Sequence, residues 1–207
     1  MTGLFITGTD TDVGKTVVAA ALALGIPGAH YWKPIQCGLE PSTDRAQVAH
    51  WAELPPERLL PEAYRLALPA SPNIAAAAEG VAIERERLRL PAAPGPVIAE
   101  GAGGILVPLN QRETMLDLMT WLGLPIVLVA RTRLGTINHT LLSVSALRQH
   151  GLRLRAVVLN GEPVPATTAT LRDWVDAPLL ELPLMPHLDR AALAQAFTRH
   201  VQELGRD

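Results

Sequence analysis

GTDTDVGKT, residues 8–16, is the stretch of sequence that decides the fold. It follows an apolar run at residues 4–6 and opens into a helical apolar pattern at residues 17–22. A buried strand, a glycine-bounded turn and an amphipathic helix in this order are typical of a phosphate-binding loop. In such a loop, backbone N–H groups and the start of the helix point at one bound polyanion. Lys15 would add a positive charge at the terminal phosphates, and Thr16 would offer a hydroxyl to a magnesium ion.

The loop departs from the usual pattern in one respect. Five residues separate Gly8 from Gly14, where the common motif has four, so Thr9 stands where a glycine is expected. The simpler alternative is an ordinary strand-to-helix turn whose lysine is only solvated. Such a turn requires neither Lys15 nor Thr16 at these positions. We therefore predict a nucleotide site here.

The composition favours one domain that acts on small molecules. At 207 residues the chain is long enough for a substantial core but short for two, so we expect one domain over residues 1–207. The 18 basic and 20 acidic residues are spread along the chain, and the formal net charge of −2 predicts neither a nucleic-acid nor a membrane partner. The single cysteine and the absence of a signal-like or bilayer-length apolar segment favour a cytoplasmic protein.

Further apolar runs predict the strands of a sheet. They lie at residues 97–99, 126–129, 156–159 and 179–182, and residues 30–33 predict another strand that ends at Pro34. The runs are continuous rather than alternating, which is typical of strands buried on both faces, and segments of helical character separate them. We therefore predict an α/β fold: a doubly wound, mostly parallel sheet with helices on both faces.

The helical pattern is clearest at residues 16–24 and 137–149, the second with Thr136 as its expected N-cap. We also expect helices at residues 115–121 and 190–204, and within the proline-rich segment 54–96. Ligands of open parallel sheets bind at the carboxyl ends of the strands. Residues that follow each apolar run are therefore the first candidates for a site.

Two charged residues stand at such strand ends. Lys33 closes the run at 30–33, where a lysine can meet anionic groups of a substrate, and its simpler reading is a surface lysine before a turn. Glu100 closes the run at 97–99, where phosphate-loop enzymes place a second magnesium ligand, usually an aspartate. The glycines that follow Glu100 permit close approach of backbone to a nucleotide, although a flexible turn after a strand is the alternative.

Other candidates have less support from the residues alone. Asp44 precedes a predicted helix, where a helix cap is the simpler explanation. Asn160 suits a tight turn, although its amide could also contact a purine edge. The helix start at residues 135–138 exposes N–H groups suited to a carboxylate or phosphate. Cys37 has no activating partner in the sequence and is expected to be a pocket wall rather than a nucleophile.

Taken together, these segments resemble one enzyme family, the dethiobiotin synthetases. The phosphate loop, the Lys33-Pro34 loop, residues 70–80 (ASPNIAAAAEG), residues 100–104 (EGAGG) and residues 134–139 (LGTINH) occur in the order seen in that family. The resemblance covers residues 3–185, and the combination is far more specific than any one segment. It implies a P-loop NTPase fold and an ATP-dependent ligase of biotin biosynthesis, which joins carbon dioxide to diaminopelargonic acid and closes a cyclic urea.

The resemblance also implies roles for individual residues. Lys33 would be catalytic, Thr11, Lys15 and Cys37 would border the carbamate and the phosphate under attack, and Mg²⁺ would be bound by Thr16, Asp44 and Glu100. ATP phosphates would be held by Asp12, Val13, Gly14, Lys15, Thr16, Glu100, Gly101, Ala102 and Gly103, and the adenine end by Asn160, Pro183, Leu184 and Met185. The site would lie at the interface of a homodimer. There Gly135, Thr136, Ile137 and Asn138 of one subunit would hold the substrate carboxylate of the other.

Two positions depart from the family pattern. Position 37 is usually a serine, and Gly161 stands where an aspartate often follows the asparagine, so contacts there would be weaker.

Two other protein classes are alternatives. Amide ligases of the cobyrinic acid synthetase type usually add a glutaminase domain with a Cys-His pair. Nucleotide switches of the ParA or MinD type carry an extra lysine near Gly8. This sequence has neither feature.

Overall fold

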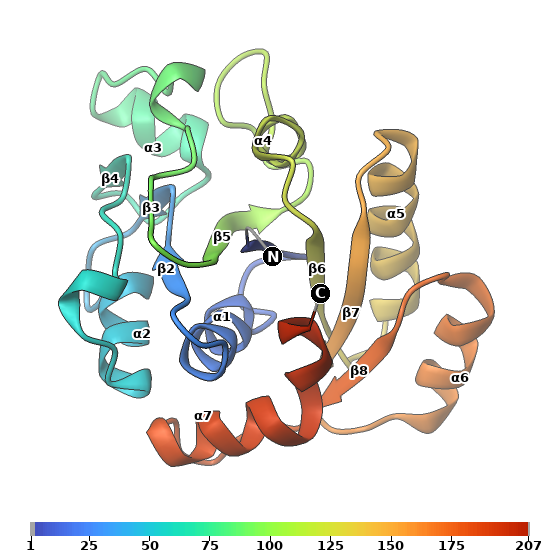
Figure 1. The fold of residues 1–207 in the computed structure, drawn as a ribbon. Helices are drawn as coiled ribbons and strands as arrows, with labels where there is room; N and C mark the ends of the chain where they lie inside the picture. Colours follow the sequence, from blue (N-terminus) through green and yellow to red (C-terminus); the bar gives the residue numbers. More distant parts are fainter. Residues whose placement is uncertain (1–2, 207) are drawn as a thin grey trace.

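A parallel six-stranded sheet forms the centre of the protein, whose computed structural model describes residues 3–206 (Figure 1). The strand order is β2-β5-β1-β6-β7-β8, and every neighbouring pair is parallel. The predicted doubly wound α/β fold is therefore confirmed. The strands are β1 (Gly3–Gly8), β2 (His30–Trp32), β5 (Val97–Gly104), β6 (Ile126–Arg131), β7 (Leu154–Asn160) and β8 (Leu179–Leu182).

Helices cover both faces of this sheet, because its central strands are apolar on both sides. All six residues of β1 are buried, and separate apolar clusters lie on the two faces. One face packs against α1 (Lys15–Gly25), α2 (Asp44–Ala52) and α7 (Arg190–Ala196), and the other against α4 (Met115–Leu122), α5 (Thr136–Gln149) and α6 (Pro165–Trp174) (Figure 1). The segments of helical character expected between the apolar runs include α6, although our sequence analysis gave this helix no bounds.

A second, two-stranded sheet lies beside the first and was missed. It pairs β3 (Ile35–Cys37) with β4 (Tyr64–Leu66) in parallel. Three-residue strands are too short to show a pattern of their own, and Pro34 ends the preceding run. The helices expected between residues 54 and 96 are present but short: α3 (Pro72–Ala78) and the 3₁₀ turns η1 (Pro56–Arg58) and η2 (Arg85–Arg87).

Both helix caps that the sequence suggested are wrong by one residue. Gly135 is the N-cap of α5 with φ 95°, a conformation that L side chains rarely adopt, and Thr136 is the first helical residue. Thr43 caps α2, because its hydroxyl accepts a hydrogen bond from the N–H of Ala46 at 3.2 Å. Asp44 is therefore the first residue of α2, and its carboxylate is not used as the cap.

The helix expected at residues 190–204 is not one regular α-helix. α7 ends at Ala196 and continues as a π-helical turn, η3 (Phe197–Val201), and a 3₁₀ turn, η4 (Gln202–Gly205). The π-helical turn begins at Phe197, whose ring packs directly on the backbone of Gly25, where a β-carbon would lie 2.1 Å from the ring. The irregular turn thus closes one end of α1.

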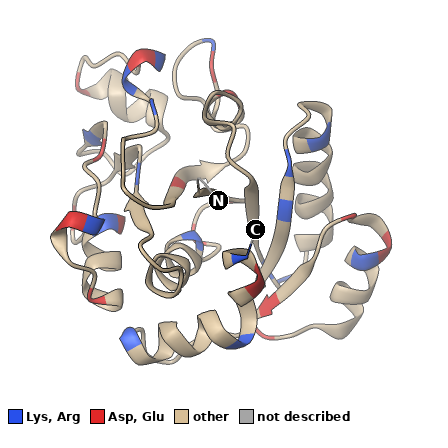
Figure 2. Cartoon of the chain, viewed as in Figure 1, with Lys and Arg blue, Asp and Glu red and all other residues tan. Residues whose placement is uncertain are grey.

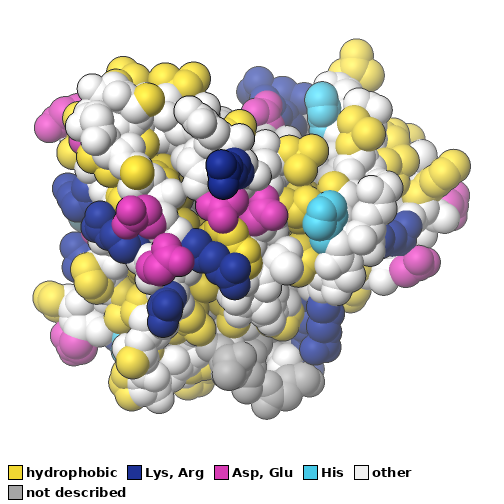
Figure 3. Space-filling view, turned by 90° about the horizontal axis from the view of Figure 1, so that it is seen from above, with side chains coloured by type: hydrophobic (Ala, Val, Ile, Leu, Met, Phe, Trp, Pro, Cys, Tyr) yellow, Lys and Arg dark blue, Asp and Glu magenta, His cyan; other side chains and the backbone are white. Residues whose placement is uncertain are grey.

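Charged residues lie mainly on the outer elements. Figure 2 places most of them on peripheral helices and loops. Glu100 is an exception, because it is buried in β5, the second strand of the sheet. On the face seen from above, basic and acidic side chains lie next to one another (Figure 3). Among the helices of residues 3–206, none is long and apolar enough to cross a bilayer.

Candidate active site

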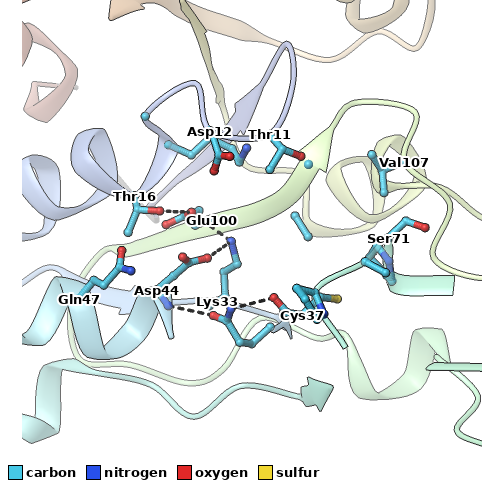
Figure 4. A pocket seen from close by; sticks show the side chains of 18 of the residues that line it. Thr11, Asp12, Thr16, Lys33, Cys37, Asp44, Gln47, Ser71, Glu100 and Val107 are labelled. Carbon is cyan, nitrogen blue, oxygen red and sulfur yellow. Dashed lines mark hydrogen bonds and ion pairs between the residues drawn. The ribbon is translucent and has the colours of Figure 1, made fainter. Parts of the chain in front are cut away.

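A cavity of about 740 Å³ opens beside β5, where the phosphate loop faces the connection between β2 and β3 (Figure 4). Its walls come from segments far apart in the sequence: the phosphate loop, the β2–β3 connection, the start of α2, the start of α3 and the glycine-rich end of β5. Eleven residues that our sequence analysis named line it: Thr11, Asp12, Gly14, Lys15, Thr16, Lys33, Cys37, Asp44, Glu100, Ala102 and Gly103.

The phosphate loop has little room for side chains. Gly14 has φ 98°, and a β-carbon there would lie 2.1 Å from Nδ2 of Asn160. That amide donates to the carbonyl of Val13 at 3.0 Å, so Asn160 supports the loop from behind. Lys15 is buried, and its Nζ donates to the carbonyl of Asp10 at 2.8 Å. Its ammonium group thus closes the loop on itself and lies at the cavity wall.

Lys33 is the central charge of the cavity. Its Nζ lies 2.6 Å from Oδ2 of Asp44 and 3.0 Å from both Oε1 of Glu100 and the carbonyl of Gly101. The hydroxyl of Thr16 donates to the same Oε1 of Glu100 at 2.9 Å. Figure 4 shows Thr16, Lys33, Asp44 and Glu100 meeting at one wall. They come from the starts of α1 and α2, from β5 and from the residue that follows β2. The structure thus brings together two strand ends and the phosphate loop, as the sequence predicted.

The surroundings shift the pKa values of the two lysines in opposite directions. Burial alone would lower the pKa of Lys33, but the charges of Glu100 and Asp44 outweigh it and raise that pKa. Burial lowers the pKa of Lys15, and the positive charge of Lys33 lowers it further. These are the only two lysines in the sequence, and the other 16 of its 18 basic residues are arginines.

We expect ATP affinity to fall at alkaline pH because Lys15 loses its proton first. The pKa of Lys15 lies below the ordinary 10.5, so the cation that we expect to meet phosphate loses its charge while Lys33 is still protonated. ATP titrations from neutral pH upward will measure this. A Lys15→Arg variant is the control, because arginine stays protonated throughout. An alkaline loss of affinity that persists in that variant would contradict the assignment.

Cys37 forms part of the cavity wall, as predicted. Burial raises the pKa of its thiol to about 11, partly opposed by the charge of Lys33. The thiol therefore stays protonated at neutral pH, which disfavours nucleophilic chemistry.

Several predicted contacts lie outside this cavity in the single chain. Pro183, Leu184 and Met185 line a separate cavity of about 320 Å³ against α7. Thr136 lines another of about 270 Å³, together with Asp10 and Arg131. The adenine and carboxylate contacts implied by the family resemblance therefore remain predictions.

The sequence analysis overlooked two polar residues beside the cavity. Tyr31 donates from its hydroxyl to Oε2 of Glu100 at 2.8 Å. Gln36 accepts from the N–H of Asp44 at 3.0 Å and donates to the carbonyl of Gly38 at 3.0 Å, which fixes the start of α2. A usable signal existed for Tyr31: it precedes Lys33 by two residues, and alternate residues share one face of a strand.

The side chains around Glu100 suit a magnesium ion. Within residues 3–206, no group of three or more His, Cys, Asp or Glu side chains is placed to hold a metal. A hydroxyl and two carboxylates do converge on one wall, and oxygen ligands of this kind suit Mg²⁺, which typically takes one or two carboxylates together with substrate phosphates and water.

Comparison with known proteins identifies the family. A family model described as "AAA domain" matches residues 2–192. The ATP-dependent dethiobiotin synthetase of Novosphingobium aromaticivorans is 48% identical over 198 residues, which is 95% of each chain. Those of Rhodopseudomonas palustris (strain HaA2) and Agrobacterium fabrum are 48% and 47% identical over 95% and 94% of this chain and 92% of their own.

The chain belongs to the ATP-dependent dethiobiotin synthetase family. The prediction of an ATP-dependent ligase of this family is thus confirmed, and the two alternative classes are not favoured.

Solved structures add a likeness of fold alone. The MinD cell division ATPase of Pyrococcus furiosus superposes with a TM-score of 0.54 at 15% identity, over 95% of this chain and 89% of its own. The MinD of Pyrococcus horikoshii, solved with Mg-ADP, also gives 0.54 at 15% identity, over 95% and 86%. At this identity the likeness shows a shared fold and no shared role.

Proposed function

We propose that the chain converts diaminopelargonic acid, carbon dioxide and ATP into dethiobiotin, ADP and phosphate, with Lys33 and the phosphate loop as the reacting surface. One observation carries the assignment of the site: Lys33 lies between Asp44 and Glu100, in the same cavity as Lys15 and Thr16. Two cations beside a phosphate loop suit a reaction whose intermediates are all anions.

The reaction proceeds in three steps. An amine of the substrate adds to carbon dioxide and loses a proton, giving a carbamate. A carbamate oxygen then attacks the terminal phosphorus of ATP, so the bond between that phosphorus and ADP breaks and a carbamic-phosphoric anhydride forms. The neighbouring amine finally attacks the carbonyl carbon, loses a proton and expels phosphate, which closes the cyclic urea. No step requires a protein nucleophile.

The two lysines stabilise different anionic groups in this reaction. Lys15, on the loop, stabilises charge on the terminal phosphate oxygens, as phosphate-loop lysines do. Lys33 faces it across the cavity and stabilises the carbamate and the oxygens that gain charge during transfer. Thr11 and Cys37 border the same space and hold the reacting groups in contact. The loop backbone from Asp12 to Thr16 and the glycine-rich end of β5 bind the phosphates.

Thr16, Asp44 and Glu100 would hold a magnesium ion, which would neutralise charge on the ATP phosphates when bound. We expect a Thr16→Val variant to need a clearly higher magnesium concentration for half-maximal rate, because valine keeps the shape of threonine but removes the ligand oxygen. Measuring rate against free Mg²⁺ for both proteins tests this. Thr7→Val is a matched control, since Thr7 is buried in β1 and does not line the cavity. An unchanged magnesium requirement would remove Thr16 from the metal site.

We propose that the adenine lies toward Asn160 and the segment 183–185, and that the working form is a homodimer. Asn160 contacts the loop next to Gly14, which brings this side of the molecule close to the phosphates. The start of α5 has Gly135 as its N-cap and no side-chain cap, so the N–H groups that follow Thr136 suit a carboxylate, whereas the N–H of Thr136 itself donates to the carbonyl of Arg133 at 3.1 Å. This helix start lies apart from the main cavity of its own chain. In a homodimer, the second subunit would supply the start of its α5 to the cavity of the first. Residues 1–207 would act as one cytoplasmic catalytic domain.

Mixing two inactive variants tests the shared site. Lys33→Ala disables the cavity, and Gly135→Val strains the turn at the start of α5, since Gly135 has φ 95°. A heterodimer of the two contains one site built only from intact parts. With random pairing, we expect an equal mixture to regain about a quarter of the wild-type activity. Each variant alone is the control, and a mixture as inactive as its components would contradict the shared site.

Phosphate release tests the function itself. ATP is supplied to the protein with diaminopelargonic acid and bicarbonate together, with either alone, and with neither. We expect phosphate to be released only when both are present, in step with dethiobiotin. Comparable release without diaminopelargonic acid would contradict the proposed reaction.

A further inference from the structure

We infer that Tyr31 is a positioning residue that fixes the Glu100 carboxylate in the cavity, a role that rests on the proposed function of that cavity. Tyr31 lies in β2 with no exposed surface, and its hydroxyl donates to Oε2 of Glu100 at 2.8 Å. The other carboxylate oxygen, Oε1, accepts from Thr16 and Lys33. Tyr31 therefore donates to the carboxylate oxygen that Thr16 and Lys33 do not contact.

The need for this contact follows from the residue type at position 100. Phosphate-loop enzymes usually have an aspartate at this strand end, and a glutamate adds one more rotatable bond. With donors on Oε1 alone, the carboxylate could still turn about its terminal bond. A third donor on the opposite oxygen fixes the carboxylate plane and so aims Oε1 at Lys33 and Thr16.

The hydroxyl of Tyr31 is suited to this constant task. Burial raises the pKa of Tyr31 well above 10, and the charges of Glu100 and Asp44 raise it further. The phenol therefore remains a donor whenever the enzyme is active. Tyr31 and Lys33 also lie two residues apart along one extended segment, which sends both side chains to the same carboxylate.

The chain offers a matched control in its only other tyrosine, Tyr64. Tyr64 is also buried, and its hydroxyl accepts one hydrogen bond, from the N–H of Glu84 at 2.8 Å. It does not line the cavity. Tyr31→Phe and Tyr64→Phe each remove one buried hydrogen bond, so both are expected to lower the melting temperature. Only Tyr31→Phe should disturb Glu100.

We expect Tyr31→Phe to lower kcat about tenfold, the size of one hydrogen bond to a charged group, with the Kd of ATP nearly unchanged. Tyr64→Phe should keep wild-type kcat. A second readout does not depend on activity: protein labelled with ¹³C at lysine Cε gives signals from Lys15 and Lys33 alone. The Lys33 signal should shift in Tyr31→Phe and stay in place in Tyr64→Phe.

Equal kcat in the two variants, or an unmoved Lys33 signal in Tyr31→Phe, would overturn the inference. If Tyr31→Phe does not fold, wild-type protein with 3-fluorotyrosine at both positions replaces it. Adding ATP and Mg²⁺ should then shift the Tyr31 fluorine signal and not that of Tyr64, and the reverse pattern would overturn the inference. Failure of the unmodified protein to make dethiobiotin would contradict the proposed function alone, because the lysine and fluorine signals still test the contact.

Discussion

Lys33→Ala is expected to lower turnover by about 10² to 10³, the usual cost of removing one group that stabilises a developing anion. ATP binding should change by less than about threefold, because Lys33 acts on the transferring group rather than on bound nucleotide. Its Nζ contacts Asp44, Glu100 and the Gly101 carbonyl, none of which belongs to the phosphate loop. Steady-state kinetics and ATP titration measure the two quantities separately. Near-normal turnover would remove the catalytic assignment.

The loss of Lys33 also affects stability, which needs its own control. The pKa of Lys33 is raised in the folded state, so its charge stabilises the fold below pH 10.5, and this stabilisation is lost as pH rises beyond that value. Removing one partner of a buried ion pair typically costs about 3–5 kcal/mol. Lys33→Ala leaves the carboxylates of Asp44 and Glu100 without their cation. The double variant Lys33→Ala/Asp44→Asn removes one of these two charges, so it should regain part of the lost melting temperature while its turnover stays low. If the double variant regained both melting temperature and turnover, the low turnover of Lys33→Ala would be due to unfolding alone.

Lys15→Ala is expected to impair binding and rate together. Lys15 lies on the phosphate loop, and a hydrogen bond to a charged group contributes about 1.5–3 kcal/mol, so ATP should bind about 10- to 100-fold more weakly. The rate at saturating ATP should also fall, because the terminal phosphate gains charge near this lysine. ATP titration and kinetics at high ATP will separate the two losses. Unchanged ATP affinity would contradict the loop assignment.

Stability should distinguish the two lysines. The pKa of Lys15 is lowered in the folded state, so its charged form destabilises the fold at neutral pH, and this cost is relieved as pH rises toward 10.5. Lys15→Ala should therefore melt no lower than the wild type without ligand, whereas Lys33→Ala should melt lower. The same substitution at the only two lysines serves as a mutual control. A large loss of stability in Lys15→Ala would contradict the electrostatic account.

The sequence predicted the features that depend on contiguous residues. Continuous apolar runs indicated a parallel sheet, because strands buried on both faces cannot alternate in polarity. The order of strand, loop, lysine and hydroxyl indicated the phosphate site, since a helix start, its N–H groups and Lys15 are fixed by local geometry. Short elements were missed for the same reason: β3 and β4 have three residues each and carry too little pattern. The caps at Thr43 and Gly135 were misassigned because several neighbouring residues can cap equally well.

By itself the sequence determined the sheet, the loop and the residue types at the strand ends, because each depends on local periodicity and backbone geometry. Only the tertiary structure decided which of them meet. Lys33 and Glu100 are 67 residues apart in the chain, and Tyr31 and Glu100 are 69 apart. Their contact depends on β2 pairing with β5 in one register, with Trp32 beside Ala99. A different register of one residue would turn these side chains to the other face.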